Sequence, residues 1–352
     1  MPTPPTPYLQ VDLDRMRRNV RDVAERASVA MLALRPHAKT HKSVEIARLQ
    51  LASGAVGLTV ATLGEAEAFV RHGCDDVLIA YPLWLHDRAA GRLRDLSDRA
   101  RVAFGVDSVE GAANAGRLLG GTGVEVLVEV DSGMHRTGCA PDDAGLVASV
   151  AARAGLRVRG VFTFPGHSYS VGASASAADD ERRALAAARD AVQAHGLEVR
   201  VLSGGSTPSL RDTDPGTVTE VRPGVYVFGD AQQWELGTMS PEEIALTAVA
   251  TVVSHAGGMA VLDAGSKVLG ADRAAYATGH GRLLDHPDAR IVALSEHHAV
   301  TDLAGAPLPR LGETVRVVPN HVCTAVNLAD DLWVEEHGSL RRCAVSARGR
   351  NG

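Results

Sequence analysis

The sequence predicts an α/β fold, a (β/α)8 barrel of the TIM type followed by a C-terminal, mainly β domain. Over the first two thirds of the chain, short runs of branched apolar residues alternate with segments of helical periodicity, which is typical of repeated βα units. From about residue 240, strand-like runs follow one another without a long helix between them. No GxGxxG or GxxxxGK[ST] motif follows an early strand, which argues against a doubly wound dinucleotide fold.

Composition supports a large globular core and excludes several partners. The chain has 352 residues, 45% hydrophobic and 22% charged, with a formal net charge of −6, as expected of a folded protein rather than a disordered one. A mildly acidic chain gives no reason to expect nucleic acid. It has no apolar run of 18 residues, and its N-terminus lacks the pattern of an export signal, so we expect no membrane partner. Four cysteines without CxxC spacing fit a reducing cytoplasm.

The first element is the strand-like segment YLQVDL, which precedes the first predicted helix. Because it lies outside the repeated βα units, we expect it to join the β domain. The predicted division is therefore an N-terminal strand in residues 1–15, a barrel in 16–238 and a β domain in 239–352.

Eight apolar runs are the predicted barrel strands. The segments between most of them carry apolar residues at i, i+3 and i+4 and end at Gly, as helices do. The low-complexity stretch VGASASAADD (171–180) predicts a mobile loop at the barrel mouth. The runs span residues 29–38, 56–62, 76–83, 101–108, 125–133, 158–166, 198–206 and 219–230.

The β domain is predicted from five further runs. They are rich in Val and Ala and are separated by Gly, Pro and charged residues, which is typical of successive strands. The runs span residues 244–256, 258–266, 289–303, 313–326 and 331–338.

The basic segment RPHAKTHK (35–42) is the first candidate site. On an extended strand end, His37, Lys39 and His41 would point the same way, so Lys39 would face the barrel mouth, where barrel active sites lie. A lysine held there is a candidate for imine formation with an aldehyde. An ordinary surface lysine in a basic turn is the alternative.

The segment PNHVC (319–323) is a candidate metal site. On a strand, residues i and i+2 share a face, so His321 and Cys323 would converge on one ion. One imidazole and one thiolate favour zinc over magnesium or calcium. Two protein ligands leave positions open for water or substrate, which suits a catalytic metal. A buried cysteine beside an unrelated histidine is the alternative.

Two glycine-containing segments are candidate phosphate sites, and an arginine follows the fifth run. SGGSTP (203–208) follows the seventh run and RPGVY (222–226) lies in the eighth, where barrels often bind phosphate. Ordinary turns use the same residue types.

Arg136, in DSGMHRTG, supplies a permanent cation suited to a phenolate or carboxylate. An ordinary salt bridge with Asp131 is the alternative.

In combination and order, these motifs resemble the D-serine dehydratase and D-threonine aldolase family, the metal-assisted branch of the alanine-racemase-like, fold type III pyridoxal-phosphate enzymes. RPHAKTHK resembles the segment with the family's cofactor lysine, and TVATLGEAEAF and DDVLIAYPL resemble its second and third strands. DSGMHRTG resembles the segment whose arginine contacts the cofactor's 3-oxygen, and GHSY the loop that presents a tyrosine near the cofactor. SGGSTPS and RPGVYVFGD resemble the phosphate loops, and PNHVC the metal pair.

The resemblance assigns roles to individual residues. It implies that Lys39 holds pyridoxal phosphate and acts as the base at Cα, and that His321 and Cys323 bind Zn²⁺ or Mn²⁺. The other implied cofactor contacts are Arg136, Tyr169, Gly204, Gly205, Ser206, Thr207, Gly224 and Tyr226.

The implied activity is that of a lyase on a D-β-hydroxy amino acid, in a homodimer. A His-x-Cys metal pair favours dehydratase-like members, which release a 2-oxo acid and ammonia, whereas several aldolases place Asp at the second ligand. Retro-aldol cleavage to glycine and an aldehyde is the alternative, followed by racemisation or a non-catalytic pyridoxal-phosphate carrier. The segment SEHHA (295–299) departs from the family's SEEHG-like pattern because a histidine stands where that pattern has its second acid. This difference puts in doubt whether the surroundings of the metal or of the substrate match those of the family.

Overall fold

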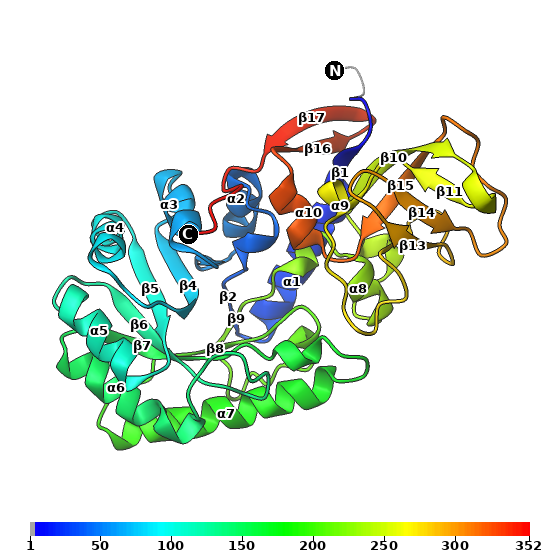
Figure 1. The fold of residues 1–352 in the computed structure, drawn as a ribbon. Coiled ribbons are helices and arrows are strands. Elements are labelled where there is room, and N and C mark those ends of the chain that lie inside the picture. The colour runs from blue at the N-terminus through cyan, green and yellow to red at the C-terminus, as the bar shows by residue number, and fades with distance from the viewer. Residues whose placement is uncertain (1–3) are drawn as a thin grey trace. The chain divides into compact units, whose positions relative to one another are not determined.

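The computed structural model describes residues 4–352 and divides into two compact units (Figure 1). The β unit contains the described residues up to Val23 together with 40–46 and 225–349, and the α/β unit contains 24–39, 47–224 and 350–352. These limits differ from the expected ones at residues 15 and 238.

Two segments account for this difference. The first half of helix α1 (Leu13–Val29) bonds to the β unit, where the Asn19 side chain donates to the carbonyl of Glu243 at 2.8 Å. Residues 40–46 also bond there, because Ser43 Oγ lies 3.2 Å from Cys343 Sγ and the Ala347 N–H donates to the Lys42 carbonyl at 2.9 Å. Such long-range contacts leave no periodic signal in the sequence.

The α/β unit is built on one sheet of eight parallel strands, and each strand overlaps one of the eight predicted runs. An isolated parallel bridge between His37 and Thr59 joins the two ends of the sheet. The predicted parallel α/β architecture is thereby confirmed. In sheet order, the strands are β2 (Ala33–Leu34), β9 (Glu220–Val221), β8 (Val201–Gly204), β7 (Arg157–Phe162), β6 (Glu125–Glu129), β5 (Arg101–Val106), β4 (Asp76–Pro82) and β3 (Leu58–Val60).

Helices follow most of these strands and lie along the outside of the sheet (Figure 1). Side-chain caps fix two of their starts, since Thr62 accepts the N–H of Glu65 and Ser108 accepts that of Gly111, in each case satisfying a free helical donor. The helices are α2 (Val44–Ala52), α3 (Leu63–Arg71), α4 (Asp87–Ser97), α5 (Val109–Leu119), α6 (Ala144–Arg153) and α7 (Ser174–Ala194), with 3-10 turns η1 (Ala38–Thr40), η2 (Pro141–Asp143), η3 (Gly166–Ser168) and η4 (Ser209–Arg211).

The expected mobile loop at 171–180 is wrong over most of its length, because α7 begins at Ser174. The stretch is rich in alanine, which has the highest helix propensity. Asp179 also pairs with Arg182 and Arg183 at helical spacing, and such pairs stabilise a helix.

The β unit contains a closed ring of six antiparallel strands in the order β10, β11, β14, β13, β12 and β15. β1 pairs antiparallel with β10 and parallel with β16, which forms a hairpin with β17. This confirms the mainly β architecture expected for the C-terminal part. The strands are β1 (Tyr8–Asp12), β10 (Leu246–Ser254), β11 (Ala260–Leu262), β12 (Gly281–Leu283), β13 (Arg290–Leu294), β14 (Ala299–Asp302), β15 (Thr314–Pro319), β16 (Asp331–Glu336) and β17 (Ser339–Ala344), and the helical segments are η5 (Val225–Val227), α8 (Ala231–Glu235), η6 (Pro241–Glu243), η7 (Ala256–Gly258), α9 (Ser266–Leu269) and α10 (Val322–Leu328).

The placement of His321 and Cys323 on one strand is wrong. β15 ends at Pro319, His321 is the N-cap residue of α10, and Cys323 lies in the first turn of that helix. The Asp230 carboxylate accepts the N–H of Val322 at 3.2 Å and so satisfies a donor that a helix start leaves free. The side chains of His321 and Cys323 still interact with each other, although a helix start and not a strand carries them.

Two layers of side chains lie inside the parallel sheet, one apolar and one charged. Leu78, Ala103, Leu127 and Phe162, from four neighbouring strands, form a buried cluster. Charged residues gather at the N-terminal ends of the strands, where Asp76, Glu125 and Glu220 pair with Arg35 and Arg159. The C-terminal ends are left for a binding site, as in parallel barrels generally.

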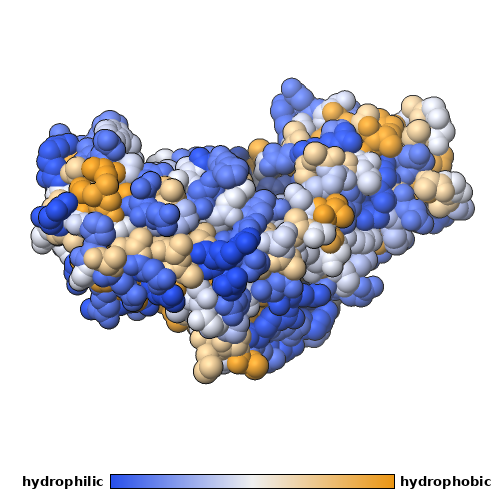
Figure 2. Space-filling model, turned by 90° about the horizontal axis from the view of Figure 1, so that it is seen from below, coloured by the Kyte–Doolittle hydropathy of each residue, from blue (hydrophilic) through white to orange (hydrophobic). Residues whose placement is uncertain are grey.

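The molecular surface is mostly polar on the face shown in Figure 2, where the apolar residues form small, separate patches. Within residues 4–352, none of the helices is long and apolar enough to cross a membrane.

Candidate active site

A cavity of about 420 Å³ opens at the C-terminal ends of the strands of the α/β unit. It contains an amine and two guanidinium groups, so it suits an anionic ligand. Lys39 and Arg136, two of the residues singled out in the sequence, both line it. The lining residues are His37, Lys39, Ala61, Thr62, Ala80, Tyr81, Arg136, Thr137, Phe164 and Arg222.

The ring of Phe164 brings three of the predicted site residues together. Lys39 Nζ lies 6.0 Å from the ring centroid, and Arg136 Cζ lies 5.2 Å from it, within the range of a cation–π attraction. The Tyr169 ring packs against Phe164 at a centroid distance of 6.2 Å. Phe164 was not predicted as a site residue, although it lies in the sixth predicted run, two residues after β7 and two before the quoted GHSY segment.

Lys39 lies in the 3-10 turn η1, not on an extended strand end. The expectation that His37, Lys39 and His41 share one face is therefore wrong, because a 3-10 turn breaks the two-residue alternation of a strand. His37 and Lys39 line the cavity. His41 is fully buried in the β unit, and its Nδ1 accepts the N–H of Ser43 at 3.1 Å.

Arg136 is carried by a closed loop after β6. The loop is closed by an isolated bridge between Val130 and Cys139 and by the Thr137 hydroxyl, which donates to Glu129 at 2.9 Å. Gly138 has a φ of +102°, and a Cβ there would lie 2.5 Å from the Asp131 nitrogen. Asp131, the expected alternative partner of Arg136, instead contacts His135 at 2.6 Å.

The candidate phosphate loop follows β8 and is rich in buried hydroxyls. Ser206 Oγ lies 2.9 Å from Ser168 Oγ and 2.8 Å from Ser209 Oγ, and Ser206 and Thr207 are both buried. Gly205 has a φ of +74°, which favours glycine. The hydroxyl cluster offers donors to an oxyanion.

Arg222 connects the phosphate loop to the cavity. Its Nε donates to Ser203 Oγ at 2.8 Å, and its backbone N–H donates to the Gly204 carbonyl at 2.9 Å. Burial lowers the pKa of Arg222. Arg222 opens the RPGVY segment without a predicted role of its own, although its position directly after β9 is where functional residues of parallel barrels lie.

Gly224 and Tyr226 are not among the residues that line this cavity. Gly224 closes the long segment of the α/β unit, and Tyr226 lies buried in η5 of the β unit. Their predicted contact with a phosphate stays a prediction.

The candidate metal pair lies in the β unit with two polar neighbours. Asp230 Oδ2 lies 3.3 Å from His321 Nδ1, and Cys323 Sγ lies 3.3 Å from Thr40 Oγ1. The charge of Cys323 is the main cause that raises the pKa of His321 to about 11; Asp230 adds to it and burial opposes it. The side chains of His321 and Cys323 therefore interact directly with each other.

Asp230 is the residue at this pair that the sequence argument missed. It is fully buried and also accepts the N–H of Gln233 at 2.9 Å, which caps α8. Over residues 4–352, no group of three or more His, Cys, Asp and Glu side chains has the arrangement of a metal site. A metal held by His321 and Cys323 would keep positions open for water or substrate, and Asp230, at 3.3 Å from the ring, is placed to orient the imidazole.

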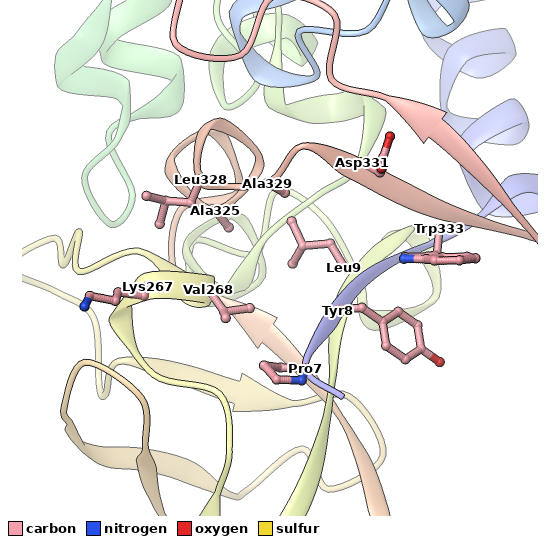
Figure 3. A pocket seen from close by; sticks show the side chains of 10 residues that line it. All are labelled: Pro7, Tyr8, Leu9, Lys267, Val268, Ala325, Leu328, Ala329, Asp331 and Trp333. Atoms are coloured by element: carbon pink, nitrogen blue, oxygen red, sulfur yellow. The ribbon is translucent and has the colours of Figure 1, made fainter. Parts of the chain in front are cut away.

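A second cavity, of about 260 Å³, lies within the β unit (Figure 3). Most of the residues that line it are apolar or aromatic, and Tyr8 and Trp333 meet edge to face at one side of it. Its one lysine, Lys267, pairs with Glu296 at 2.8 Å. This lining has no guanidinium group, and Glu296 engages its one amine, so we assign it no part in the chemistry.

Comparison with known proteins identifies the family of this chain. The family model "Alanine racemase, N-terminal domain" matches residues 11–232, and "Putative serine dehydratase domain" matches residues 245–335. D-threo-3-hydroxyaspartate dehydratase of Delftia sp. (strain HT23) is 35% identical over 90% of this chain and 90% of its own length. The chain belongs to the D-serine dehydratase and D-threonine aldolase family.

Other relatives of this family agree with that assignment. D-threonine aldolase of Arthrobacter sp. is 32% identical over 98% of this chain and 93% of its own length. The solved structure of the Delftia dehydratase has a TM-score of 0.90 and 32% identity, with 97% of each chain covered. A cysteine-to-alanine mutant of that dehydratase is described as a metal-free form, and it has a TM-score of 0.88. The resemblance noted in the sequence is confirmed.

The residues of the α/β unit fit the family's pyridoxal phosphate. The cofactor needs an amine for its aldehyde, cations for its phenolate and donors for its phosphate. Lys39, Arg136 and the Ser206 hydroxyl cluster offer these groups. Gly204 allows the loop to approach Glu181 closely, because a Cβ on Gly204 would lie only 2.1 Å from Glu181 Oε1.

Proposed function

We propose that this protein is a pyridoxal-phosphate- and divalent-metal-dependent lyase that dehydrates a D-β-hydroxy amino acid to a 2-oxo acid and ammonia. The observation that carries the proposal is the cationic cavity, in which Lys39 and Arg136 meet at the ring of Phe164. The names of the two relatives, a dehydratase and an aldolase of D-amino acids, support the substrate class.

The residues of the α/β unit hold the cofactor in this proposal. The amine of Lys39 binds its aldehyde and afterwards takes the proton from the substrate Cα. Arg136 holds the 3-oxygen beside Phe164, and Tyr169 packs behind that ring. The loops at Gly204–Thr207 and at Gly224–Tyr226 bind the phosphate. Bound pyridoxal phosphate supplies the electron sink that stabilises negative charge at Cα.

The residues of the β unit hold the metal. His321 and Cys323 bind Zn²⁺ or Mn²⁺, which acts as a Lewis acid on the β-hydroxyl of the substrate. Asp230 keeps the imidazole in orientation from its buried position. In this view the parallel sheet works as a closed TIM-type barrel that carries the cofactor, and the β unit adds the metal.

Retro-aldol cleavage is the second candidate, because the aldolase relative is nearly as similar as the dehydratase. The His321-x-Cys323 pair favours dehydration in our reading. The substrate that the dehydratase relative names, D-threo-3-hydroxyaspartate, is therefore the first to assay, followed by D-serine and D-threonine. We further propose a homodimer that acts in the cytoplasm; light scattering of the purified protein tests the dimer.

Product analysis with and without EDTA tests this function. We expect a 2-oxo acid and ammonia from the wild type, and loss of turnover with EDTA or in Cys323→Ala. Cys343→Ala, a buried cysteine of the same unit, is the control and keeps metal-dependent turnover. Glycine and an aldehyde as products would replace the dehydratase by the aldolase. Full activity of chelated Cys323→Ala protein would remove the metal from the mechanism.

A further inference from the structure

A buried acid lies directly behind the candidate phosphate loop. Glu181, on α7, is fully buried, and its Oε1 accepts the N–H of Gly205 at 2.5 Å. Within the described chain, Glu181 Oε2 is a buried atom with no hydrogen-bond partner. An ionised carboxylate in such a place is costly, since one of its oxygens is neither hydrated nor bonded.

The loop is shaped around this acid. A Cβ on Gly204 would lie 2.1 Å from Glu181 Oε1 and 2.6 Å from its carboxyl carbon. Gly205 takes a φ of +74° and turns its N–H to the same oxygen. The two glycines of SGGS thus allow the loop to contact Glu181. The Gly205 N–H is hydrogen-bonded to this carboxyl group.

The charged surroundings of Glu181 are sparse. Arg222, which bonds Ser203 and lines the cavity, is the cation that acts on it. From η3, His167 Nε2 contacts Asp180, the residue before Glu181, at 3.2 Å. Burial raises the pKa of Glu181 to about 7, against the opposing effects of the Gly205 N–H and of Arg222.

We propose that Glu181 is a positioning residue for the cofactor phosphate, which it serves as a neutral carboxylic acid that holds the Gly204–Gly205 turn in its binding shape. This inference rests on the proposed pyridoxal-phosphate site. When the acid ionises, its charge stands behind the loop that receives a phosphate dianion, and like charges repel. Retention of the cofactor therefore weakens as the pH rises through neutrality.

The test measures the dissociation constant of pyridoxal phosphate by equilibrium dialysis of the loaded full-length protein from about pH 6 to about pH 8.5. We expect the wild-type constant to rise about tenfold over this range. Glu181→Gln, a neutral side chain of the same shape, keeps the low-pH constant and removes the part of the pH dependence due to Glu181. Glu181→Ala weakens binding about tenfold at the low end of this range, where the wild-type acid is neutral and holds the turn. Asp179→Asn, on the exposed side of α7, is the control and follows the wild type.

A second ligand separates a phosphate effect from general loosening. Pyridoxal, which lacks the phosphate, should bind equally to the wild type and to Glu181→Gln at every pH. Equal pH slopes for pyridoxal phosphate in wild type and Glu181→Gln, or wild-type affinity in Glu181→Ala, would overturn the role of Glu181. A wild-type protein that takes up no pyridoxal phosphate would instead overturn the proposed function.

Discussion

Asp230 joins the start of a helix to the candidate metal pair. One of its oxygens accepts the N–H of Gln233, and the other contacts His321 Nδ1 and the N–H of Val322. A buried carboxylate with three partners is held in one orientation, and so it fixes the imidazole ring. The sequence shows this aspartate only as the last letter of VYVFGD, where nothing marks it as a neighbour of a residue 91 positions later.

Replacing this aspartate should weaken metal binding without removing a ligand. We expect Asp230→Asn to lower the affinity for Zn²⁺ by about 10- to 100-fold, because the ring loses its charged partner. Competition with a chromogenic chelator measures this affinity. Asp302→Asn, at an exposed residue of the β unit that accepts the local N–H of Ala304, is the matched control. Equal affinities of Asp230→Asn and the control would show that Asp230 has only a capping role.

Residue types at strand ends were the most informative part of the sequence. Lys39 and Arg136 could be placed at the mouth of the α/β unit because side chains after parallel strands gather at one edge. Phe164, Arg222 and Asp230 were missed, since an aromatic ring, a buried arginine and a helix cap are common in any core. Their roles depend on contacts between segments distant in sequence.

At the scale of elements, the strands were easier to predict than the turns that carry the site. All eight strands of the parallel sheet lie in or overlap the predicted apolar runs, because a buried strand needs a run of branched apolar residues. The 3-10 turn at Lys39 and the helix start at His321 were predicted as extended. Hydrogen bonds from other segments fix these turns, and local periodicity does not report them.

The contact between α7 and the loop after β8 gives a prediction at this scale. In Gly204→Ala the new methyl group must displace the Glu181 carboxyl, which breaks its bond to Gly205. We expect the affinity for pyridoxal phosphate to fall about tenfold or more, since a hydrogen bond in the binding loop is lost. Equilibrium dialysis measures it.

Gly91→Ala is the matched control for this change. Gly91 lies inside α4 and has nothing within 4 Å of an added Cβ, so alanine should stabilise the protein by up to about 1 kcal/mol. If Gly204→Ala binds the cofactor as Gly91→Ala does, the close approach of Glu181 has no effect on the loop.

The whole α/β unit depends on a charged layer at the N-terminal ends of its strands. Arg35 is 1% exposed and pairs with Asp76 at 2.8 Å and with Glu220 at 2.7 Å. If Arg35 is removed, these two carboxylates lose their shortest ion pairs, and Arg159, at 3.3 Å from Asp76 and 3.9 Å from Glu220, compensates only part of their charge. Because the layer lies at the end of the sheet opposite the cavity, its loss should act on stability and not directly on the site.

We expect Arg35→Met to lower the free energy of unfolding by about 3–5 kcal/mol, as measured in urea. Arg101→Met is the control, since Arg101 is 45% exposed and pairs with Glu125 at the rim of the same layer; its loss should cost at most about 1 kcal/mol. Similar costs for the two variants would mean that the buried network contributes no more than a surface pair.

Chemical labelling of the cofactor lysine tests the central claim most directly. The protein is loaded with pyridoxal phosphate, reduced with borohydride and digested, and the peptides are mapped by mass spectrometry. We predict one pyridoxyl-phosphate adduct, on Lys39, and no stoichiometric adduct in Lys39→Ala. A label on another lysine, or none in the wild type, would contradict the assignment of Lys39 and the enzyme activity built on it.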